Sequence, residues 1–305
     1  MPLTHVVLDD ERYSIEEARE VVASRDNSLR YTPELFEAML ATRQERDYIS
    51  TTSLTAKCTR QQSIQRQYNY TEDLDGMWAS FRGTMFHGQL EKNIVDPAIE
   101  EARFFIEVDG IELSGSPDVV TPDSGIVYDY KFCKEVPRWN KPWSDHVEQG
   151  NINRYLCDHA HKVHWRGWEI TEDAPPVRIP GQTQPAGGVK ALGRFTKPSA
   201  FRPIDWQDIV VVYMDDKGVK PLRCTKSIQI PKVDPTQGTK AAVVSDVWSD
   251  EQVEELIDVR FPKAYTALTL LTIPQAPEGW EHQGHVLCGY CGVRAECAAL
   301  EREGK

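Results

Sequence analysis

The chain has 305 residues, of which 40% are hydrophobic and 27% are charged, as in an ordinary globular protein with a sizeable core. Its net charge of -12 argues against a protein that coats nucleic acid nonspecifically. No apolar run approaches the roughly 20 residues of a membrane span, and no basic-then-apolar signal opens the chain, so we expect a cytoplasmic protein without a membrane partner. In that setting the seven cysteines predict reduced thiols or metal ligands instead of disulfides.

The first 48 residues are predicted to form a helical extension, separate from the rest. Ser14–Ala23 and Pro33–Arg43 are rich in helix-forming residues, and Thr32 stands where an N-cap would precede Pro33. A main domain over residues 49–305 is expected to begin with a helix that carries Cys58 and Arg60. The next helix is expected over Met77–Glu91.

A sheet is predicted next. Arg103–Val108 and Ile111–Ser114 flank Asp109-Gly110, a strong hairpin signal, and Ile126–Phe132 is expected as the third strand of a meander. The later elements are expected to be helices over His146–Ala160 and Ser249–Leu271, and strands over Val163–Ile170, Ile209–Met214 and Leu222–Ile230.

Between these elements lies a basic segment rich in Pro and Gly, residues 175–203, which predicts a long loop. It contains no acidic residue. A solvated insertion and a flap that binds a nucleic-acid strand are equally consistent with it. Its candidate nucleic-acid-binding residues are Arg178, Lys190, Arg194 and Lys197.

Two short motifs indicate metal-assisted hydrolysis. Pro117-Asp118 precedes Asp129-Tyr130-Lys131, and in a regular strand Asp129 and Lys131 point to the same face. Carboxylates can hold a hard divalent metal that activates water, while an ammonium group stabilises developing charge. The Tyr130 carbonyl could add a ligand. Alone, an Asp-x-Lys pattern is also common on exposed strands, where it has no catalytic role.

Other residues could complete such a site. His87 and Glu91 lie at i, i+4 on one predicted helix and so face the same side, although a lone helical His is more often structural. Gln149 lies in the helix that follows the catalytic strand, where it could hydrogen-bond the attacking water or the scissile phosphate. Trp139 and Trp143 could stack on bases or serve as buried loop anchors.

These motifs, in this order, resemble the PD-(D/E)xK nuclease superfamily, and within it the RecB-like iron-sulfur branch that includes CRISPR-associated exonucleases of spacer acquisition and their viral relatives. The matching segments are Gly83–His87, Ser114–Asp118, Asp129–Lys131 and the helix of Gln149, within roughly residues 49–300. The resemblance implies an α/β fold with a restriction-endonuclease-like core, a mixed central sheet flanked by helices. It also implies that Asp118, Asp129 and His87 bind Mg or Mn and that Lys131 is catalytic. Where the family has the Tyr of a Gln-x-x-x-Tyr motif, this chain has Asn153, with Tyr155 two residues later.

Four cysteines follow the same resemblance: Cys58 near the front of the chain, and Cys288, Cys291 and Cys297 near its end. They look like the ligands of a [4Fe-4S] cluster in a subdomain formed by both chain ends. Four thiolates can also hold zinc, and spacing does not separate the two metals.

We therefore expect a DNA exonuclease that acts on single-stranded ends and leaves a 5′-phosphate and a 3′-hydroxyl. Its setting would be DNA recombination or repair, viral replication or CRISPR adaptation, with a protein partner from that pathway. Two alternatives stay open: a non-catalytic nucleic-acid-binding or assembly subunit of such a complex, and a zinc-stabilised hydrolase that acts on another substrate.

Overall fold

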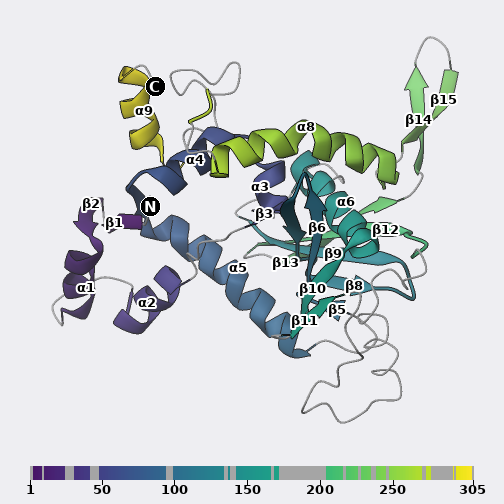
Figure 1. Cartoon of the computed structure of the whole chain (residues 1–305). Helices are drawn as coiled ribbons and strands as arrows, with labels where there is room; N and C mark the ends of the chain where they lie inside the picture. Colours follow the sequence, from purple (N-terminus) through teal and green to yellow (C-terminus); the bar gives the residue numbers. More distant parts are fainter. Residues whose placement is uncertain are drawn as a thin grey trace. The chain divides into compact units, whose positions relative to one another are not determined.

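The structure is a computed structural model. It describes residues 3–8, 10–24, 31–41, 48–93, 99–133, 137, 142–165, 168–171, 204–215, 218–225, 228–234, 238–244, 247–269, 273–275, 291 and 293–303. The chain is mixed α/β and divides into two compact units, each built from segments that are far apart in the sequence. Figure 1 shows the course of the chain through its helices and strands. Unit 1 comprises Met1–Asp47, Ala56–Met85 and Val259–Lys305, and unit 2 comprises Tyr48–Thr55 and Phe86–Asp258.

Unit 1 contains a three-stranded sheet with helices around it. Its strand order is β2-β1-β4, in which β1 pairs antiparallel with β2 and parallel with β4. The strands are β1 (Leu3–Leu8), β2 (Glu11–Ser14) and β4 (Tyr70–Asp73). The helices that lie wholly in this unit are α1 (Ile15–Ala23), α2 (Pro33–Ala41), α4 (Thr59–Gln67) and α9 (Arg294–Arg302).

Local signals fix the starts of α1 and α2. The Ser14 hydroxyl accepts from the Glu17 backbone, and the Glu17 carboxylate accepts from the Ser14 backbone, which is a capping box. At α2, the Thr32 hydroxyl accepts from Leu35 N–H, as the sequence predicted. The strands β1 and β2, in contrast, were not predicted within the expected helical extension.

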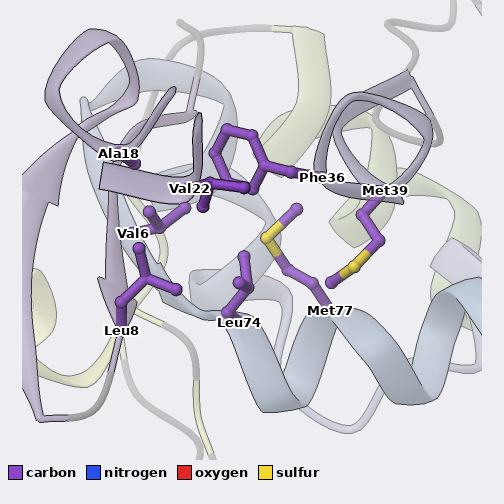
Figure 2. Packing of buried hydrophobic residues seen from close by; sticks show 8 residues of the cluster. All are labelled: Val6, Leu8, Ala18, Val22, Phe36, Met39, Leu74 and Met77. Carbon is purple, nitrogen blue, oxygen red and sulfur yellow. The ribbon is translucent and has the colours of Figure 1, made fainter. Parts of the chain in front are cut away.

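One apolar cluster joins four elements of unit 1. Figure 2 shows side chains from β1, α1, α2 and the first turns of α5 (Leu74–Asn93) pointing toward one another. All are buried, and alternate residues of β1 supply two of them, as the period of a strand requires. The cluster consists of Val6, Leu8, Ala18, Val22, Phe36, Met39, Leu74 and Met77.

Unit 2 contains two five-stranded mixed sheets. Their orders are β11-β10-β6-β7-β3 and β13-β12-β9-β8-β5. Pairing is antiparallel except between β3 and β7 and between β9 and β12. The first sheet uses β3 (Ile49–Ser50), β6 (Arg103–Val108), β7 (Ile111–Gly115), β10 (Lys162–Trp165) and β11 (Trp168–Thr171). The second uses β5 (Ile99–Glu100), β8 (Val119–Thr121), β9 (Ile126–Phe132), β12 (Asp208–Asp215) and β13 (Gly218–Thr225).

The remaining elements include the helices α3 (Thr51–Thr55), α6 (Ser144–His159) and α8 (Asp250–Thr269). The boundary between the units falls within α5 and within α8. A separate hairpin joins β14 (Ile228–Asp234) and β15 (Gly238–Val244).

Several predicted elements are confirmed and others are wrong. The hairpin around Asp109-Gly110 forms with positive φ at both turn residues, and the predicted strand Ile126–Phe132 is β9. The predicted meander is wrong, because β6 and β7 belong to one sheet whereas β9, its expected third strand, belongs to the other. The expected strands Val163–Ile170 and Leu222–Ile230 are each divided, into β10 and β11 and into β13 and β14.

Candidate active site

The first part of the site is a group of three ligand-type side chains in unit 2. His87 comes from α5, Glu101 follows β5, and Asp118 precedes β8. His87 Nδ1 lies 2.9 Å from Glu101 Oε1 and 3.2 Å from Asp118 Oδ1. Among the described residues, these are the His, Cys, Asp and Glu side chains that gather at least three ligand atoms within 4.8 Å of one another.

Backbone contacts hold this group together. Glu101 N–H donates to the Asp118 carbonyl at 3.1 Å, and the Tyr130 N–H donates to Asp118 Oδ2. Glu101 also has a φ of 47°, a left-handed conformation that is uncommon for a residue other than glycine. The main chain therefore ties residue 101 to residue 118 and holds the Asp118 carboxylate against β9.

Electrostatics couple His87 to its carboxylates. Burial alone would lower the pKa of His87, but hydrogen bonds and charge from Asp118 and Glu101 outweigh it and raise that pKa to about 10. Burial raises the pKa of Asp118 to about 6; the hydrogen bond from His87 opposes this shift and the charge of Asp129 adds to it. A proton on His87 thus offsets part of the negative charge of the two carboxylates.

The second part of the site is the β9 pair Asp129 and Lys131. They point to one face of the sheet, and Lys131 Nζ lies 3.0 Å from Asp129 Oδ1 and donates to Gln149 Oε1 on α6, also at 3.0 Å. Burial alone would lower the pKa of Lys131, but the charges of Asp129 and Asp118 raise it. The amine therefore stays an ammonium group at neutral pH.

One buried carboxylate oxygen in this part has no partner within the described part of the chain. Asp129 is 1% exposed, and its Oδ2 has no hydrogen-bond partner among the described residues, although Oδ1 is paired with Lys131. A buried carboxylate oxygen left unsatisfied is costly, and a cation is one way to satisfy it. Carboxylate oxygens with an imidazole nitrogen form a donor set that suits Mg²⁺ or Mn²⁺. The residues present therefore fit a divalent metal ion.

Close packing of α6 on β12 positions Gln149. A Cβ on the neighbouring Gly150 would lie 2.5 Å from Ile209 Cγ2, so only glycine allows this approach. Tyr213, also on β12, is fully buried, accepts from the Trp143 N–H at 3.1 Å and is hydrogen bonded to His146 Nδ1 at 2.7 Å. These contacts fix the start of α6 beside the strand that pairs with β9.

Trp143 directly precedes this helix, and the residue is 40% exposed. The ring packs edge-on against Tyr213 with centroids 5.2 Å apart, and it lies 5.4 Å from His146. One side of the indole is therefore supported, while part of its surface stays open to a ligand.

Two α6 residues from the motif region do not join the site contacts. Tyr155 donates through its hydroxyl to Glu254 on α8 at 2.9 Å and stacks on His159. Asn153 is fully buried, and its side-chain oxygen and nitrogen have no partner among the described residues.

The structure describes three of the four predicted cluster cysteines, Cys58, Cys291 and Cys297, which belong to unit 1 and form no disulfide among the described residues. Cys58 directly precedes α4, and Arg60 on α4 donates through Nε to Cys297 Sγ at 3.4 Å. Cys291 and Cys297 pack against an apolar cluster that includes Ile64 and Leu300. Cysteine sulfurs are donors that suit a soft metal or an iron-sulfur cluster, and one of them, Cys297 Sγ, lies beside the buried Arg60 guanidinium.

The structure thus brings Lys131, Asp129 and Gln149 into contact, and His87 with Asp118. The Tyr130 side chain packs near Phe86, with ring centroids 5.6 Å apart. The side chain of Glu91 lies outside the described part of the chain, although its backbone is described. The following predicted site residues lie outside it entirely: Cys288, Trp139, Arg178, Lys190, Arg194 and Lys197.

Sequence reasoning missed Glu101. The chain has a Glu100-Glu101 pair between His87 and Pro117-Asp118, but neither spacing nor a motif separates the two glutamates. It also missed Tyr213. This residue lies in an apolar strand, and nothing in the sequence distinguishes it before the register that pairs it with Lys131 is known.

None of the helices in the described part of the chain combines the length and the apolar character that a membrane span requires. No family model matches the chain, and no curated protein matches it. Among solved structures, the crystal structure of SSO0001 is similar at 15% sequence identity, with 86% of this chain and 93% of that chain covered and a TM-score of 0.43. A similarity at this level carries no argument about activity.

Proposed function

We propose that this chain is a divalent-metal-dependent deoxyribonuclease of the PD-(D/E)xK superfamily, an exonuclease that acts on single-stranded DNA ends. The observation that carries the proposal is the position of Lys131 Nζ, 3.0 Å from both Asp129 Oδ1 and Gln149 Oε1. The Asp-x-Lys and Gln motifs require an ammonium group that lies between a strand carboxylate and a helix amide, and Lys131 has this position. In this proposal, the β9-containing sheet and α6 belong to a restriction-endonuclease-like core.

The metal would be held by His87, Asp118 and Asp129, with the Tyr130 carbonyl as a further donor. Mg²⁺ or Mn²⁺ bound there would supply Lewis acidity at the phosphate and would lower the pKa of a water molecule. Lys131, kept protonated by its carboxylates, stabilises charge that develops on the phosphate. Gln149 fixes the direction of the Lys131 amine, and the remaining amide donors of Gln149 can orient the attacking water or the substrate.

Trp143 supports a DNA substrate with unpaired bases. Its partly exposed ring, held by Tyr213 and His146, offers a rigid face on which a base can stack. Stacking on an aromatic side chain is worth about 1–3 kcal/mol per base and does not depend on sequence. Trp139 and the basic residues of the segment 175–203 would extend this surface.

Unit 1 would carry the [4Fe-4S] cluster on Cys58, Cys288, Cys291 and Cys297. Arg60 supports this role, because its buried side chain donates to Cys297 Sγ and to the Pro274 carbonyl. A hydrogen bond from a cation stabilises the negative charge on a thiolate ligand. Such a cluster would fasten α4 to the α9 region and so stabilise the unit.

The test is digestion of end-labelled single- and double-stranded DNA with Mn²⁺ or Mg²⁺ by protein purified without oxygen. Three proteins are compared: the wild type, Lys131→Ala, and Lys263→Ala, whose lysine is exposed on α8. We expect metal-dependent cleavage by the wild type and by Lys263→Ala, and loss of at least about a hundredfold in Lys131→Ala. A folded, metal-loaded wild type that binds these DNAs without cutting them would refute the nuclease and favour a non-catalytic binding or assembly subunit.

A further inference from the structure

The geometry points to Glu101 as a direct ligand of the divalent metal ion, alongside His87 and Asp118. This inference rests on the proposed metal site, and it adds a carboxylate that the superfamily-type motifs of this chain do not include. Glu101 lies 14 residues beyond His87 in the chain and makes a 2.9 Å contact with it. No motif spacing leads to this residue, so the assignment depends on the structure alone.

The distances between the three side chains match those between ligands of one small cation. Around an octahedral ion with bonds of about 2.1 Å, neighbouring ligand atoms lie about 3.0 Å apart. His87 Nδ1 lies 2.9 Å from Glu101 Oε1 and 3.2 Å from Asp118 Oδ1. All three ligand atoms lie within 4.8 Å of one another, as ligands of one such ion must.

A carboxylate beside a metal-binding histidine can also act indirectly, by orienting the ring. In that role it accepts from the ring nitrogen that does not bind the metal. Glu101 and Asp118 instead approach the same nitrogen of His87, Nδ1. If His87 Nδ1 and Asp118 bind the ion, Glu101 is therefore on the metal side of the ring, and an orienting role at the opposite nitrogen does not fit.

The backbone at Glu101 supports the assignment independently. Its φ of 47° is sterically costly for a residue with a Cβ, and such conformations cluster at ligand-binding sites. Glu101 also donates its N–H to the Asp118 carbonyl. The strained backbone at Glu101 is therefore hydrogen bonded to Asp118, the other carboxylate residue of the group.

Exposure leaves room for the remaining ligands. The side chains of His87 and Glu101 are 28% and 25% exposed, whereas that of Asp118 is 9% exposed. The site is thus closed on the Asp118 side and partly open on the other. Mg²⁺ and Mn²⁺ sites commonly keep water or phosphate oxygens in such open positions.

Direct binding of Mn²⁺ tests the inference without DNA. The free ion is titrated by electron paramagnetic resonance against the full-length wild type, Glu101→Gln and Glu107→Gln, the last carrying the same change at an exposed position of β6. Glutamine at 101 keeps an oxygen that can accept from His87 but loses the charge. We expect Glu101→Gln to weaken Mn²⁺ binding at least about tenfold, as His87→Gln and Asp118→Asn should, and Glu107→Gln to bind like the wild type.

Unchanged Mn²⁺ affinity in Glu101→Gln, with weaker binding in His87→Gln and Asp118→Asn, would overturn the inference while leaving the nuclease intact. Glu101-dependent Mn²⁺ binding by a protein that cleaves no DNA would uphold the inference and refute the proposed function. Circular dichroism in EDTA shows whether each variant is folded. If Glu101→Gln is not, Glu101→Asp replaces it: weaker Mn²⁺ binding supports ligation, and unchanged binding refutes it.

Discussion

At the scale of single residues, the orientation of the Lys131 ammonium is set by two oxygen acceptors from different elements, Asp129 on its own strand and Gln149 on α6. A lysine side chain has many rotamers, and each acceptor removes some of them. In the proposed nuclease, an amine held in this way would lose little entropy when the substrate arrives. The Gln149 contact is therefore expected to matter for rate more than for folding.

Replacement of Gln149 by Ala should lower DNA cleavage by about 10- to 100-fold, the usual cost of losing a group that orients a site residue. The amide makes no other described hydrogen bond, so the unfolding free energy should change little. End-labelled digestion and urea denaturation measure the two effects. Gln207→Ala, an exposed glutamine of the same unit, is the control, and equal activity of the two variants would contradict the prediction.

The raised pKa of His87 predicts a pH dependence of stability for the protein kept in EDTA. The pKa is about 10 in the folded state and about 6.5 in an unfolded chain. A raised pKa stabilises the folded state fully below about pH 6.5, and this stabilisation is lost as the pH rises through about 10. The unfolding free energy should therefore fall between pH 7 and 10.

Urea titrations of the wild type and His87→Gln at several pH values check this slope. The difference between the two proteins is the measured quantity, since cysteines also titrate in this range. We expect the wild type to lose its advantage over the variant as the pH approaches 10. Parallel curves for the two proteins would show that His87 is not held as a cation by Glu101 and Asp118.

The sequence could predict the relative position of two site residues only where they lie close together along the chain. Asp129 and Lys131 were predictable because a strand places residues two apart on one face. Gln149 and His87 followed from a family resemblance, since their distance along the chain carries no geometric information. Glu101 followed from neither, because its carboxylate reaches His87 through a left-handed turn that no residue preference signals at a glutamate.

At the scale of elements, the packing of α6 on β12 at Gly150 sets the height of the helix above the strands of the site. Ile209, which Gly150 approaches, is buried and β-branched, so its Cγ2 cannot easily move aside. A methyl group at position 150 would push the helix outward and draw Gln149 away from Lys131.

Gly150→Ala should therefore destabilise the protein. Overpacking costs about 1–3 kcal/mol, which exceeds the gain of up to about 1 kcal/mol from replacing a helical glycine. Activity should fall as well. Gly76→Ala is the matched control, because nothing lies within 4 Å of its added Cβ on α5, and it should stabilise by about 0.4–1 kcal/mol. Urea denaturation of both variants decides, and a stabilising Gly150→Ala would refute the close approach.

A second contact between elements links α6 to the start of α8. Arg154 is 5% exposed and lies 2.8 Å from Asp250 Oδ1 and 3.6 Å from Asp158 Oδ2, while Asp158 also accepts from Trp206. Removing one partner of a buried ion pair leaves the other charge uncompensated, at a cost of about 3 kcal/mol or more.

Arg154→Met should accordingly be strongly destabilising, whereas Asp250→Asn should cost about 1 kcal/mol or less, because the Asp250 side chain is 41% exposed. Denaturation in urea at fixed ionic strength compares the two variants. Because urea is uncharged, the denaturant itself does not screen the ion pair. Equal effects would indicate that Arg154 contributes through packing alone.

Sequence pattern predicted elements where the signal was local. The Asp109-Gly110 hairpin and β9 were found because turn chemistry and strand alternation act over a few residues. The two divided strands were missed although Arg166-Gly167 offered a turn signal within Val163–Ile170. The parallel pairing of β9 with β12 joins residues about 80 positions apart, and nothing local encodes it.

At the scale of the whole molecule, the two proposed metal centres belong to different units: the thiols to unit 1 and the His87 group to unit 2. Loss of one centre should therefore leave the other in place. Cys58→Ser should lose iron and visible absorbance and should unfold at a lower temperature, yet it should still bind Mn²⁺. Cys133→Ser, at a cysteine outside the proposed cluster, is the control, and full iron content in Cys58→Ser would contradict the ligand assignment.

Unit 1 combines the segments 56–85 and 259–305, which are joined by contacts such as Arg60 with Cys297 and Thr71 with Glu296. During synthesis the first of these segments leaves the ribosome long before the second exists, whereas the residues of unit 2 are all made by position 258. Domains generally fold as their chain emerges. Unit 2 can thus fold first, before the residues that contact α4 have been made. The cluster would therefore be inserted only after synthesis has passed Cys297.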